Sequence, residues 1–522
     1  MGRMGNFVIL RKRYINVLSI AFYQFRLKTV SLEVEVMGAL VAAVHKKGQN
    51  VVPSVVSMLN ELKHRGKDSH GVATADSVTI AKTIENLSTD NVSSSVVLGH
   101  NLSRTLPRDH PQPVQGDGFT FVFEGRLFPS PNLQELPEPE QLAITLSSSP
   151  MRNASHILES MEGSYVFAVA ESDRIVAGRD VFGAVPLYYG ENGSVCALAS
   201  ERKALWKLGL DDVKSFPPGH LAVVDAHGFS FSPVKALHMP PIKRVSLETA
   251  AQALHLLLLE STRKRVSDLD EVAVAFSGGV DSSVVAALAK DAGLEVQLVA
   301  VGLEDQPEVM FAQEAAEALE LPLHFQTYTV DELEATLAKA LWLTEESGLV
   351  GACVAVPFYW TAEAASKLGY PVLLAGQGAD ELFGGYKRYL TEYARSGDEA
   401  VREIMFRDVV NAYSDNFQRD NQVCAYHGVE LRLPFIDCDV VDFALRLPLR
   451  LKLNSAEDLL RKRVLRRVAR NLDIPDFIAD KPKKAIQYTT GVTKAIKRKA
   501  KTEGLTLREY ITEIYNKTYP TQ

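Results

Sequence analysis

The sequence predicts two domains: a strand-rich α+β domain over residues 37–225, and an α/β domain with a parallel sheet wrapped by helices over residues 246–522. Three observations support this organisation. A chain of 522 residues is too long for one hydrophobic core. Short β-rich segments separated by turn residues fill the first half. Strand-like and helical segments alternate in the second half, which is typical of a parallel sheet.

The first half consists mainly of short apolar segments. We expect strands at 39–44, 95–98, 119–123, 165–170 and 221–224. Helical character is limited to 59–63 and 140–161. Turn signals such as Gln115-Gly116-Asp117-Gly118 and Pro217-Pro218-Gly219 separate these segments. Residues 226–245, which include a loose stretch at 232–241, are expected to form a linker.

In the second half, predicted helices and strands alternate along the chain. The expected order is a helix at 247–265, a strand at 272–276, a helix at 283–292, a strand at 297–301, a helix at 309–319, an edge strand at 323–328, a helix at 330–343 and a strand at 371–375. The chain beyond residue 392 is expected to be largely helical. This alternation predicts a doubly wound sheet, whose ligands bind at the carboxyl ends of the strands.

Composition excludes several classes of protein. The chain is 46% hydrophobic and 23% charged, and its net charge of −7 argues against a nucleic-acid partner. The four cysteines form no CxxC pair, which argues against a zinc site and fits a reducing cytoplasm. No uninterrupted apolar run is long enough to span a bilayer. We therefore expect a cytoplasmic protein that acts on small molecules.

The first 36 residues are an extension or a mis-assigned start. Basic residues at 11–13 precede a loosely apolar run at 14–25, which mimics a short signal peptide. Gln24 and Arg26 follow with no small-residue cleavage site, so we discount that interpretation. Met37 is an alternative start.

A phosphate-binding loop is expected where the strand at 272–276 ends. The run from Ala275 to Ser283 reads Ala-Phe-Ser-Gly-Gly-Val-Asp-Ser-Ser and leads into a helix. Glycines let a phosphate approach the backbone, and the first N–H groups of a helix point at it with the positive end of the helix dipole. The hydroxyls of Ser277, Ser282 and Ser283 can add donors.

Asp281 in this run needs a separate explanation, because a carboxylate repels a phosphate. It becomes useful if it holds a Mg²⁺ ion that bridges to the phosphates. The spacing differs from the Gly-x-x-x-x-Gly-Lys of the P-loop. It resembles the PP-loop of ATP pyrophosphatases, which adenylate a substrate and release pyrophosphate.

A second site-like run extends from Leu373 to Tyr386. It also follows a strand, so it falls at the same edge of the sheet. Gly376 and Gly378 suit a close backbone approach. Asp380 can be a second oxygen ligand, which with Asp281, phosphate oxygens and waters would complete an octahedral magnesium site.

Two further runs complete the pattern. One is Gly428 to Asp437, which reads Gly-Val-Glu-Leu-Arg-Leu-Pro-Phe-Ile-Asp. The other is Lys481-Pro482-Lys483-Lys484-Ala485, preceded by Arg461, Lys462 and Arg466. Lysines beside an ATP site can stabilise the charge that builds on the α-phosphate and on departing pyrophosphate.

These four runs, in this order, resemble the synthetase domain of asparagine synthetases across residues 246–495. The resemblance implies a Mg·ATP-dependent reaction in two steps: the aspartate side chain is adenylated with release of pyrophosphate, and ammonia then displaces AMP. It assigns the ATP contacts to Ser277, Gly278, Gly279, Asp281, Ser282, Ser283, Val301, Gly302 and Gly376. It assigns the metal to Asp281 and Asp380, and transition-state stabilisation to Lys483, with Lys484 as a close rival.

One departure concerns position 377. The family usually has Ser-Gly-Glu-Gly-Ala-Asp-Glu, whereas this chain has Ala375-Gly376-Gln377-Gly378-Ala379-Asp380-Glu381. The amide of Gln377 can orient a substrate by hydrogen bonds, but it cannot accept a proton from ammonium. The substitution bears on the efficiency of the second step and on the identity of the nucleophile.

The first half resembles the N-terminal-nucleophile (class 2) glutamine amidotransferase domain. The resemblance rests on His64-Arg65-Gly66-Lys67-Asp68, Leu98-Gly99-His100, Gln112-Pro113, Gly178 to Gly183, Pro186 to Tyr189, Ala199-Ser200-Glu201 and Pro217-Pro218-Gly219. In that family a mature N-terminal Cys attacks glutamine, with its own α-amine as base. Gly38 stands at the corresponding position and has no nucleophile.

The residues that would hold glutamine are altered as well. Asn101 replaces the arginine that follows Gly-His in the family, and Glu124-Gly125-Arg126 replaces Asn-Gly-Glu. We therefore expect an amidotransferase fold that does not hydrolyse glutamine.

The leading hypothesis is an asparagine-synthetase-like ligase that uses aspartate and free ammonia, with glutamine not a direct donor. One alternative is an amide ligase for another carboxylic acid, as in the β-lactam synthetase relatives of the family. Another is a non-catalytic binding or regulatory subunit. Assembly as a homodimer, and delivery of ammonia by another chain, are open.

Overall fold

The computed structural model describes residues 38–128, 138–147, 149–304, 306 and 308–519. The hypotheses about residues 1–36 and about Met37 as a start concern the part of the chain outside these ranges. Residues 35–522 group into one compact unit.

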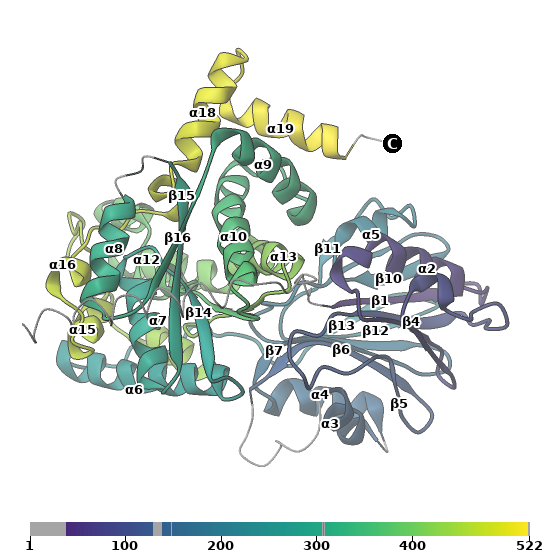
Figure 1. Cartoon of the computed structure of the whole chain (residues 1–522). Helices are drawn as coiled ribbons and strands as arrows, with labels where there is room; N and C mark the ends of the chain where they lie inside the picture. Colours follow the sequence, from purple (N-terminus) through teal and green to yellow (C-terminus); the bar gives the residue numbers. More distant parts are fainter. Residues whose placement is uncertain (1–37, 129–137, 148, 305, 307, 520–522) are drawn as a thin grey trace, which may run out of the picture. The chain divides into compact units, whose positions relative to one another are not determined.

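The first half of this unit is built on two antiparallel sheets (Figure 1). The first sheet has the order β11 (Lys214–Ser215), β9 (Tyr188–Glu191), β10 (Val195–Ala199), β1 (Ala39–His45), β4 (Val96–Leu102), β2 (Ser69–Ala73) and β3 (Val78–Ala81). The second has the order β13 (Gly228–Pro233), β12 (His220–Asp225), β8 (Ile175–Arg179), β7 (Gly163–Ala170), β6 (Thr120–Leu127) and β5 (Val114–Gln115).

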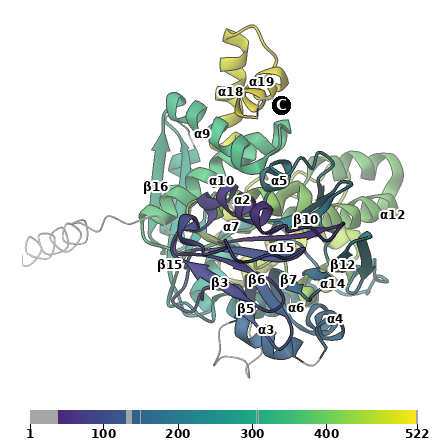
Figure 2. The same ribbon diagram turned by 90° about the vertical axis from the view of Figure 1, so that its right-hand side faces the viewer.

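Alternating side chains on β1 explain how these sheets stack. Ala39, Val41 and Ala43 pack against the core of α2 (Val52–Glu61), whereas Leu40, Ala42 and Val44 pack toward the second sheet. Phe121 and Phe123 on the far face of the second sheet join α3 (Glu138–Leu146) and α4 (Pro150–Ser160). Figures 1 and 2 show the resulting order of helix, sheet, sheet and helix. This architecture confirms the class 2 amidotransferase-like fold.

The second half contains a parallel sheet with the order β16 (Leu323–Tyr328), β15 (Glu295–Leu303), β14 (Glu271–Ala275), β17 (Val372–Leu374) and β18 (Glu430–Arg432). Its connections change direction at β14. From β14 the chain moves through α7 (Val280–Asp291) to β15 and through α8 (Glu308–Ala318) to β16, and it then crosses back to β17. The carboxyl ends of β14 and β17 therefore meet at a topological switch point, where such sheets bind ligands. This confirms the predicted parallel sheet, including β16 as an edge strand.

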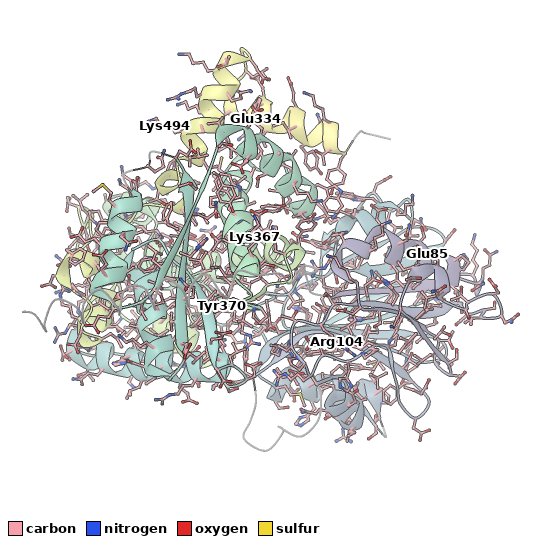
Figure 3. The ribbon with its side chains drawn as sticks, viewed as in Figure 1. Glu85, Arg104, Glu334, Lys367, Tyr370 and Lys494 are labelled. Carbon is pink, nitrogen blue, oxygen red and sulfur yellow. The ribbon has the colours of Figure 1, made fainter. Side chains whose placement is uncertain are left out.

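Helices surround this sheet. They are α6 (Leu247–Val266), α7, α8, α9 (Val330–Thr344), α10 (Leu349–Lys367), α11 (Ala379–Phe383), α12 (Lys387–Ala412), α13 (Gln418–Tyr426), α14 (Cys438–Arg446), α15 (Arg463–Asn471), α16 (Asp476–Ala479), α17 (Ile486–Thr489), α18 (Val492–Thr502) and α19 (Leu507–Thr518). The remaining short elements are α5 (Arg202–Trp206), the 3₁₀ turns Lys63–Arg65, Ile84–Asn86 and Leu449–Leu451, and a π-helical segment at Tyr413–Phe417. Figure 3 labels Glu334 of α9, which anchors the last two helices: it pairs with Lys499 Nζ at 2.6 Å and accepts a hydrogen bond from Tyr510 Oη at 3.1 Å.

Some predicted elements differ from the structure. The helix expected at 59–63 is α2, which begins at Val52 because Pro53 suits the first helical turn. The single stretch expected at 140–161 is two helices, and Pro150 begins the second. The expected linker 226–245 contains β13, because Gly228–Pro233 pairs along its whole length with β12. Helix α7 begins at Val280, three residues earlier than expected.

Other elements had no counterpart among the predictions. Strand β18 is only three residues long and fully buried, so it shows no alternation of polar and apolar positions. Helix α10 is the longest such omission and is apolar on most of its surface. Within the described residues no single helix is long and apolar enough to cross a membrane, although the bent pair of α9 and α10 meets the length and composition limits together.

Candidate active site

A pocket lies at the carboxyl ends of β14 and β17, and the predicted phosphate-binding loop and the Gly376 loop meet there. A Cβ atom at Gly376 would lie 3.0 Å from the Cβ atom of Asp281, so glycine lets the two segments approach closely without displacing each other. The predicted residues that line the pocket are Ser277, Asp281, Ser282, Val301, Gly376, Gln377, Asp380, Lys483 and Lys484. Gly302 follows Val301 on β15, and the Ser283 side chain is fully buried on α7.

The loop between β14 and α7 is built by glycine and serine. Gly278 has a φ of +65°, and a Cβ there would lie 2.9 Å from the Phe311 ring. The Ser282 hydroxyl accepts a hydrogen bond from Ser277 N at 3.2 Å and donates to Gly279 O at 3.1 Å. The first intrahelical bond of α7 runs from Ser283 N to Gly279 O, so the preceding N–H groups have no intrahelical acceptor. The loop is therefore suited to an anion.

Two carboxylates and two ammonium groups form the charged centre of the pocket. Lys462 Nζ lies 2.6 Å from Asp281 Oδ2 and 2.5 Å from Asp380 Oδ1. Lys483 Nζ lies 2.8 Å from Asp380 Oδ2 and 3.3 Å from Asp281 Oδ2. Both lysines thus bridge both carboxylates, which come from the first turns of α7 and α11.

The ion pairs set the ionisation of this cluster. Burial raises the pKa of Asp380, but Lys462 and Lys483 lower it, and the net pKa lies well below the usual range. Burial lowers the pKa of Lys483, yet Asp380 and Asp281 raise it above its ordinary value. At neutral pH the pocket therefore holds an ionised Asp380 beside a protonated Lys483.

Lys462 is held in place by an unusual backbone. Its side chain is fully buried, and its φ of +53° lies in the left-handed region. Gly385 makes room for it, because a Cβ at 385 would overlap both Asp380 Oδ1 and Lys462 Cε. The close packing of Asp380 and Lys462 thus depends on a glycine.

The donor set suits a hard cation. Asp281 and Asp380 already converge on a single ammonium group, and carboxylate oxygens are the ligands that Mg²⁺ prefers. No cluster of three or more His, Cys, Asp or Glu side chains with metal-binding geometry occurs in the described part of the chain. Phosphate oxygens and waters would have to supply the other ligands.

The two candidate lysines differ in their surroundings. Lys483 is committed to both carboxylates, whereas Lys484 Nζ pairs with Glu308 at 3.2 Å and its side chain is 61% exposed. The geometry favours Lys483 for the charged centre and leaves Lys484 at the pocket rim.

Part of the pocket lining is apolar. Val301 lines the pocket together with Ala300, Phe325, Val354 and Phe358. A flat aromatic group such as a purine base can pack in such surroundings.

Gln377 lies at the boundary between the charged centre and α13. Its Nε2 donates a hydrogen bond to Asp420 Oδ2, and Asp420 is fully buried. Asp420 Oδ1 in turn accepts from Arg419 Nε at 2.8 Å. The amide at 377 is thus tied to a carboxylate from a different element.

A second pocket is lined by Gly38, Glu124, Gly125 and Arg126 of the predicted degenerate glutaminase site, whereas Asn101 lies buried beside it. A Cβ at Gly38 would lie 2.5 Å from Glu124 Oε2 and 2.8 Å from Asn101 O. Glu124 Oε2 also lies 3.3 Å from His100 Nε2. The Glu124 carboxylate therefore occupies the space toward which a side chain at position 38 would point.

Asn101 and Gly125 have structural roles here. Asn101 is fully buried, and its Nδ2 donates to Leu59 O at 2.9 Å and Leu62 O at 3.1 Å. Gly125 has a φ of +118°, and a Cβ there would overlap Ser164 O. The Asn101 amide is used to hold α2 against its strand.

Arg126 connects this pocket to the second half of the chain. Its guanidinium group lies 2.9 Å from Glu430 Oε2, 3.0 Å from Asp109 Oδ1 and 3.3 Å from Glu138 Oε1. Glu430 also pairs with Arg432 Nε at 2.6 Å. Glu430 lies on β18, which pairs with β17, the strand that leads to Gln377. The Arg126–Glu430 ion pair therefore connects the second pocket with the sheet that carries the main pocket.

Two buried residues beside the main pocket were not predicted to have a role there. Lys462 was noted only as part of a basic run, and Asp420 was not singled out. A charge argument could have pointed to Lys462, since two buried carboxylates need cationic partners. Asp420 has no local motif, because it follows Gln377 by 43 residues on another element.

Comparisons with known proteins follow the same division. The family described as asparagine synthase matches residues 253–399 and 391–517, and the family described as glutamine amidotransferase domain matches 100–207. A putative glutamine-hydrolyzing asparagine synthetase 1 of Methanocaldococcus jannaschii is 32% identical over 505 residues, which cover 86% of this chain and 93% of that protein. The glutamine-hydrolyzing asparagine synthetase B of Escherichia coli is 26% identical over 407 residues, which cover 74% of this chain and 70% of that protein. A solved glutamine phosphoribosylpyrophosphate amidotransferase from B. subtilis aligns with a TM-score of 0.34 and 17% identity, covering 55% of this chain and 65% of that one.

The fold and the pocket define an ATP-pyrophosphatase-type domain joined to an amidotransferase-like domain. The chain belongs to the asparagine synthase family. Family membership supports an ATP-dependent amidation ligase activity, and the expected resemblance is confirmed.

Proposed function

We propose that this protein activates the side-chain carboxylate of aspartate with Mg·ATP and amidates it with free ammonia to give asparagine. The observation that carries the proposal is the convergence of Asp281, Asp380, Lys462 and Lys483 beside the Ser277–Gly279 loop. Charges of both signs, placed at a helix N-terminus, suit a nucleotide whose phosphates are being separated.

In the first step an aspartate carboxylate oxygen attacks the α-phosphorus of ATP. The bond from that phosphorus to the bridging oxygen breaks, and pyrophosphate leaves with the electron pair. The first turn of α7 would bind pyrophosphate, and Lys483 would stabilise the negative charge that builds on it. Bound Mg²⁺, held by Asp281 and Asp380, would supply further neutralisation of the phosphate charge.

In the second step the nitrogen of ammonia attacks the acyl carbon. The bond from that carbon to the AMP oxygen breaks, AMP leaves with the electron pair, and the nitrogen loses a proton to water. We assign free ammonia as the nitrogen source because Gly38 carries no side chain and the Glu124 carboxylate fills the adjacent space. The Asp109, Glu138 and Glu430 carboxylates that engage Arg126 further occupy this pocket.

The test is an aspartate-dependent exchange of labelled pyrophosphate into ATP by the full-length protein, followed by product analysis with ammonia or glutamine. We expect exchange with aspartate, asparagine from ammonia, and none from glutamine alone. Exchange with other acids but not aspartate would instead indicate a ligase for another substrate. Exchange with no acid would favour a non-catalytic subunit, and asparagine formed from glutamine alone would overturn the assignment of Gly38.

A further inference from the structure

Gln377 and Asp420 form a buried pair at the edge of the main pocket. Gln377 lines the pocket three residues before Asp380, whereas Asp420 lies on α13 with no exposed surface. The hydrogen bond from Gln377 Nε2 to Asp420 Oδ2 connects them. No step of the proposed reaction has so far used this contact.

Arg419 holds the Asp420 carboxylate in position. Its Nε donates to Asp420 Oδ1 at 2.8 Å, while its other nitrogens donate to Asp415 O at 2.9 Å and Asn416 Oδ1 at 3.3 Å. Burial raises the pKa of Asp420 above its ordinary value, although the Arg419 guanidinium and the Gln377 amide act in the opposite direction. Both Asp420 oxygens therefore have a hydrogen-bond donor beside them.

The chemistry of the pair determines how the Gln377 amide is oriented. Asp420 Oδ1 accepts from Arg419 Nε and Oδ2 accepts from Gln377 Nε2, so the NH₂ end of the amide faces Asp420. The Oε1 end is then directed away from Asp420, and it has no hydrogen-bond partner among the described residues. A glutamate at 377 would instead bring two carboxylates into contact.

We propose that Asp420 is a positioning residue that orients Gln377 so that its Oε1 atom accepts an N–H of the attacking ammonia. This inference rests on the proposed function. It gives the second step a neutral acceptor that aligns the nucleophile toward the acyl carbon without taking its proton. It also explains why an amide is compatible with position 377 in this chain, because the Asp420 carboxylate accepts a hydrogen bond from that amide.

The test uses four variants of the full-length protein: Asp420→Asn, Gln377→Glu, the double variant, and Asp408→Asn as a control. Asp408 is a matched carboxylate, because it pairs with Arg388 at 2.7 Å and accepts from Tyr389 Oη at 2.5 Å away from the pocket. Aspartate-dependent pyrophosphate exchange reports the first step. The KM for ammonia and the kcat for amide formation report the second.

The expected results separate the two steps. In Asp420→Asn, the new NH₂ group faces the Gln377 amide and reverses it, so the KM for ammonia rises about 3- to 10-fold while exchange stays within about twofold. Gln377→Glu places like charges in contact and lowers amide formation by about 100-fold. In the double variant the introduced asparagine amide can donate to the introduced glutamate carboxylate, and amide formation recovers to within about tenfold of the parent. Asp408→Asn changes neither step.

Two outcomes would overturn the inference. Unchanged ammonia kinetics in Asp420→Asn, with exchange intact, would show that Asp420 has no part in positioning and would leave the proposed function standing. No recovery in the double variant would show that the two residues are not coupled. If the parent protein exchanges pyrophosphate with no acid, the proposed function fails, and the inference fails with it.

Discussion

The two pockets of this protein use buried charge in opposite ways. In the main pocket two lysines bridge Asp281 and Asp380, and all four side chains lie beside the loop that would take the phosphates. In the second pocket Arg126 is engaged by three carboxylates, one of which belongs to the other half of the chain. The first arrangement can exchange its ion pairs for ligand contacts, whereas the second stabilises the contact between the two halves.

The difference lies in what the polar side chains of the second pocket contact. Gly38 presents no side chain, Asn101 holds α2 and Arg126 reaches β18. Asn101 and Arg126 are thus both engaged by structural partners. The ion pairs of Arg126 connect the two halves of the chain, so we expect substitutions there to change stability before they change chemistry.

The largest effect is expected from Lys483→Met. Removing this ammonium group leaves the charge on departing pyrophosphate without a partner, so aspartate-dependent exchange should fall by about 10³-fold. The matched control is Lys484→Met, which should stay within about threefold because Lys484 is mostly exposed. An equal loss of pyrophosphate exchange in both variants would contradict the distinction between Lys483 and Lys484.

Arg126→Met should have the next largest effect, on stability. It leaves three carboxylates in a buried site with one cation fewer, which costs about 3 kcal/mol of unfolding free energy. Urea denaturation measures this cost. Arg174→Met is the control, since Arg174 forms a partly exposed pair with Glu171 and should change stability by less than about 1 kcal/mol. Equal losses in the two variants would contradict the interface role.

The loss of unfolding free energy in Arg126→Met should depend on pH. Burial raises the pKa of Glu430, but Arg126 and Arg432 lower it well below its usual range. A carboxyl group of this kind contributes stability above its unfolded pKa of about 4.3 and loses that contribution as the pH falls. The difference in unfolding free energy between the parent protein and Arg126→Met should therefore be greatest near neutral pH and become smaller below about pH 4. Urea denaturation at several pH values measures this difference. A deficit independent of pH would point to lost packing instead.

The smallest effect is expected from Gly38→Ala. The added Cβ would crowd Glu124 Oε2 and Asn101 O, so the unfolding free energy should fall by about 1–2 kcal/mol. Gly193→Ala is the control, because a Cβ there meets nothing within 4 Å.

Because a side chain at position 38 would also crowd Glu124 and Asn101, Gly38→Cys alone should not create glutaminase activity. The measurement is the release of glutamate from glutamine. Release by that variant would show that the second pocket is still competent.

The fold classes could be predicted from the sequence, as could the close approach of the Ser277–Gly279 and Gly376 segments. Glycine and serine between a strand and a helix are local signals, since they act through backbone freedom and helix N–H groups within a few residues. The parallel order of the strands followed from alternation, and the switch point brought Asp281 and Asp380 to one edge. Elements without such signals were not predicted: β18 is three residues long, and β13 was taken for part of a linker.

Only the tertiary structure decided which charges meet. Lys462 lies 181 residues from Asp281, Asp420 lies 43 residues from Gln377, and Glu430 lies 304 residues from Arg126. Such pairs have no local pattern, because an ion pair depends on burial and on distance in space and not on spacing in the chain. The sequence predicted a phosphate site and a pocket without a nucleophile, and the folded chain showed which residues balance each charge.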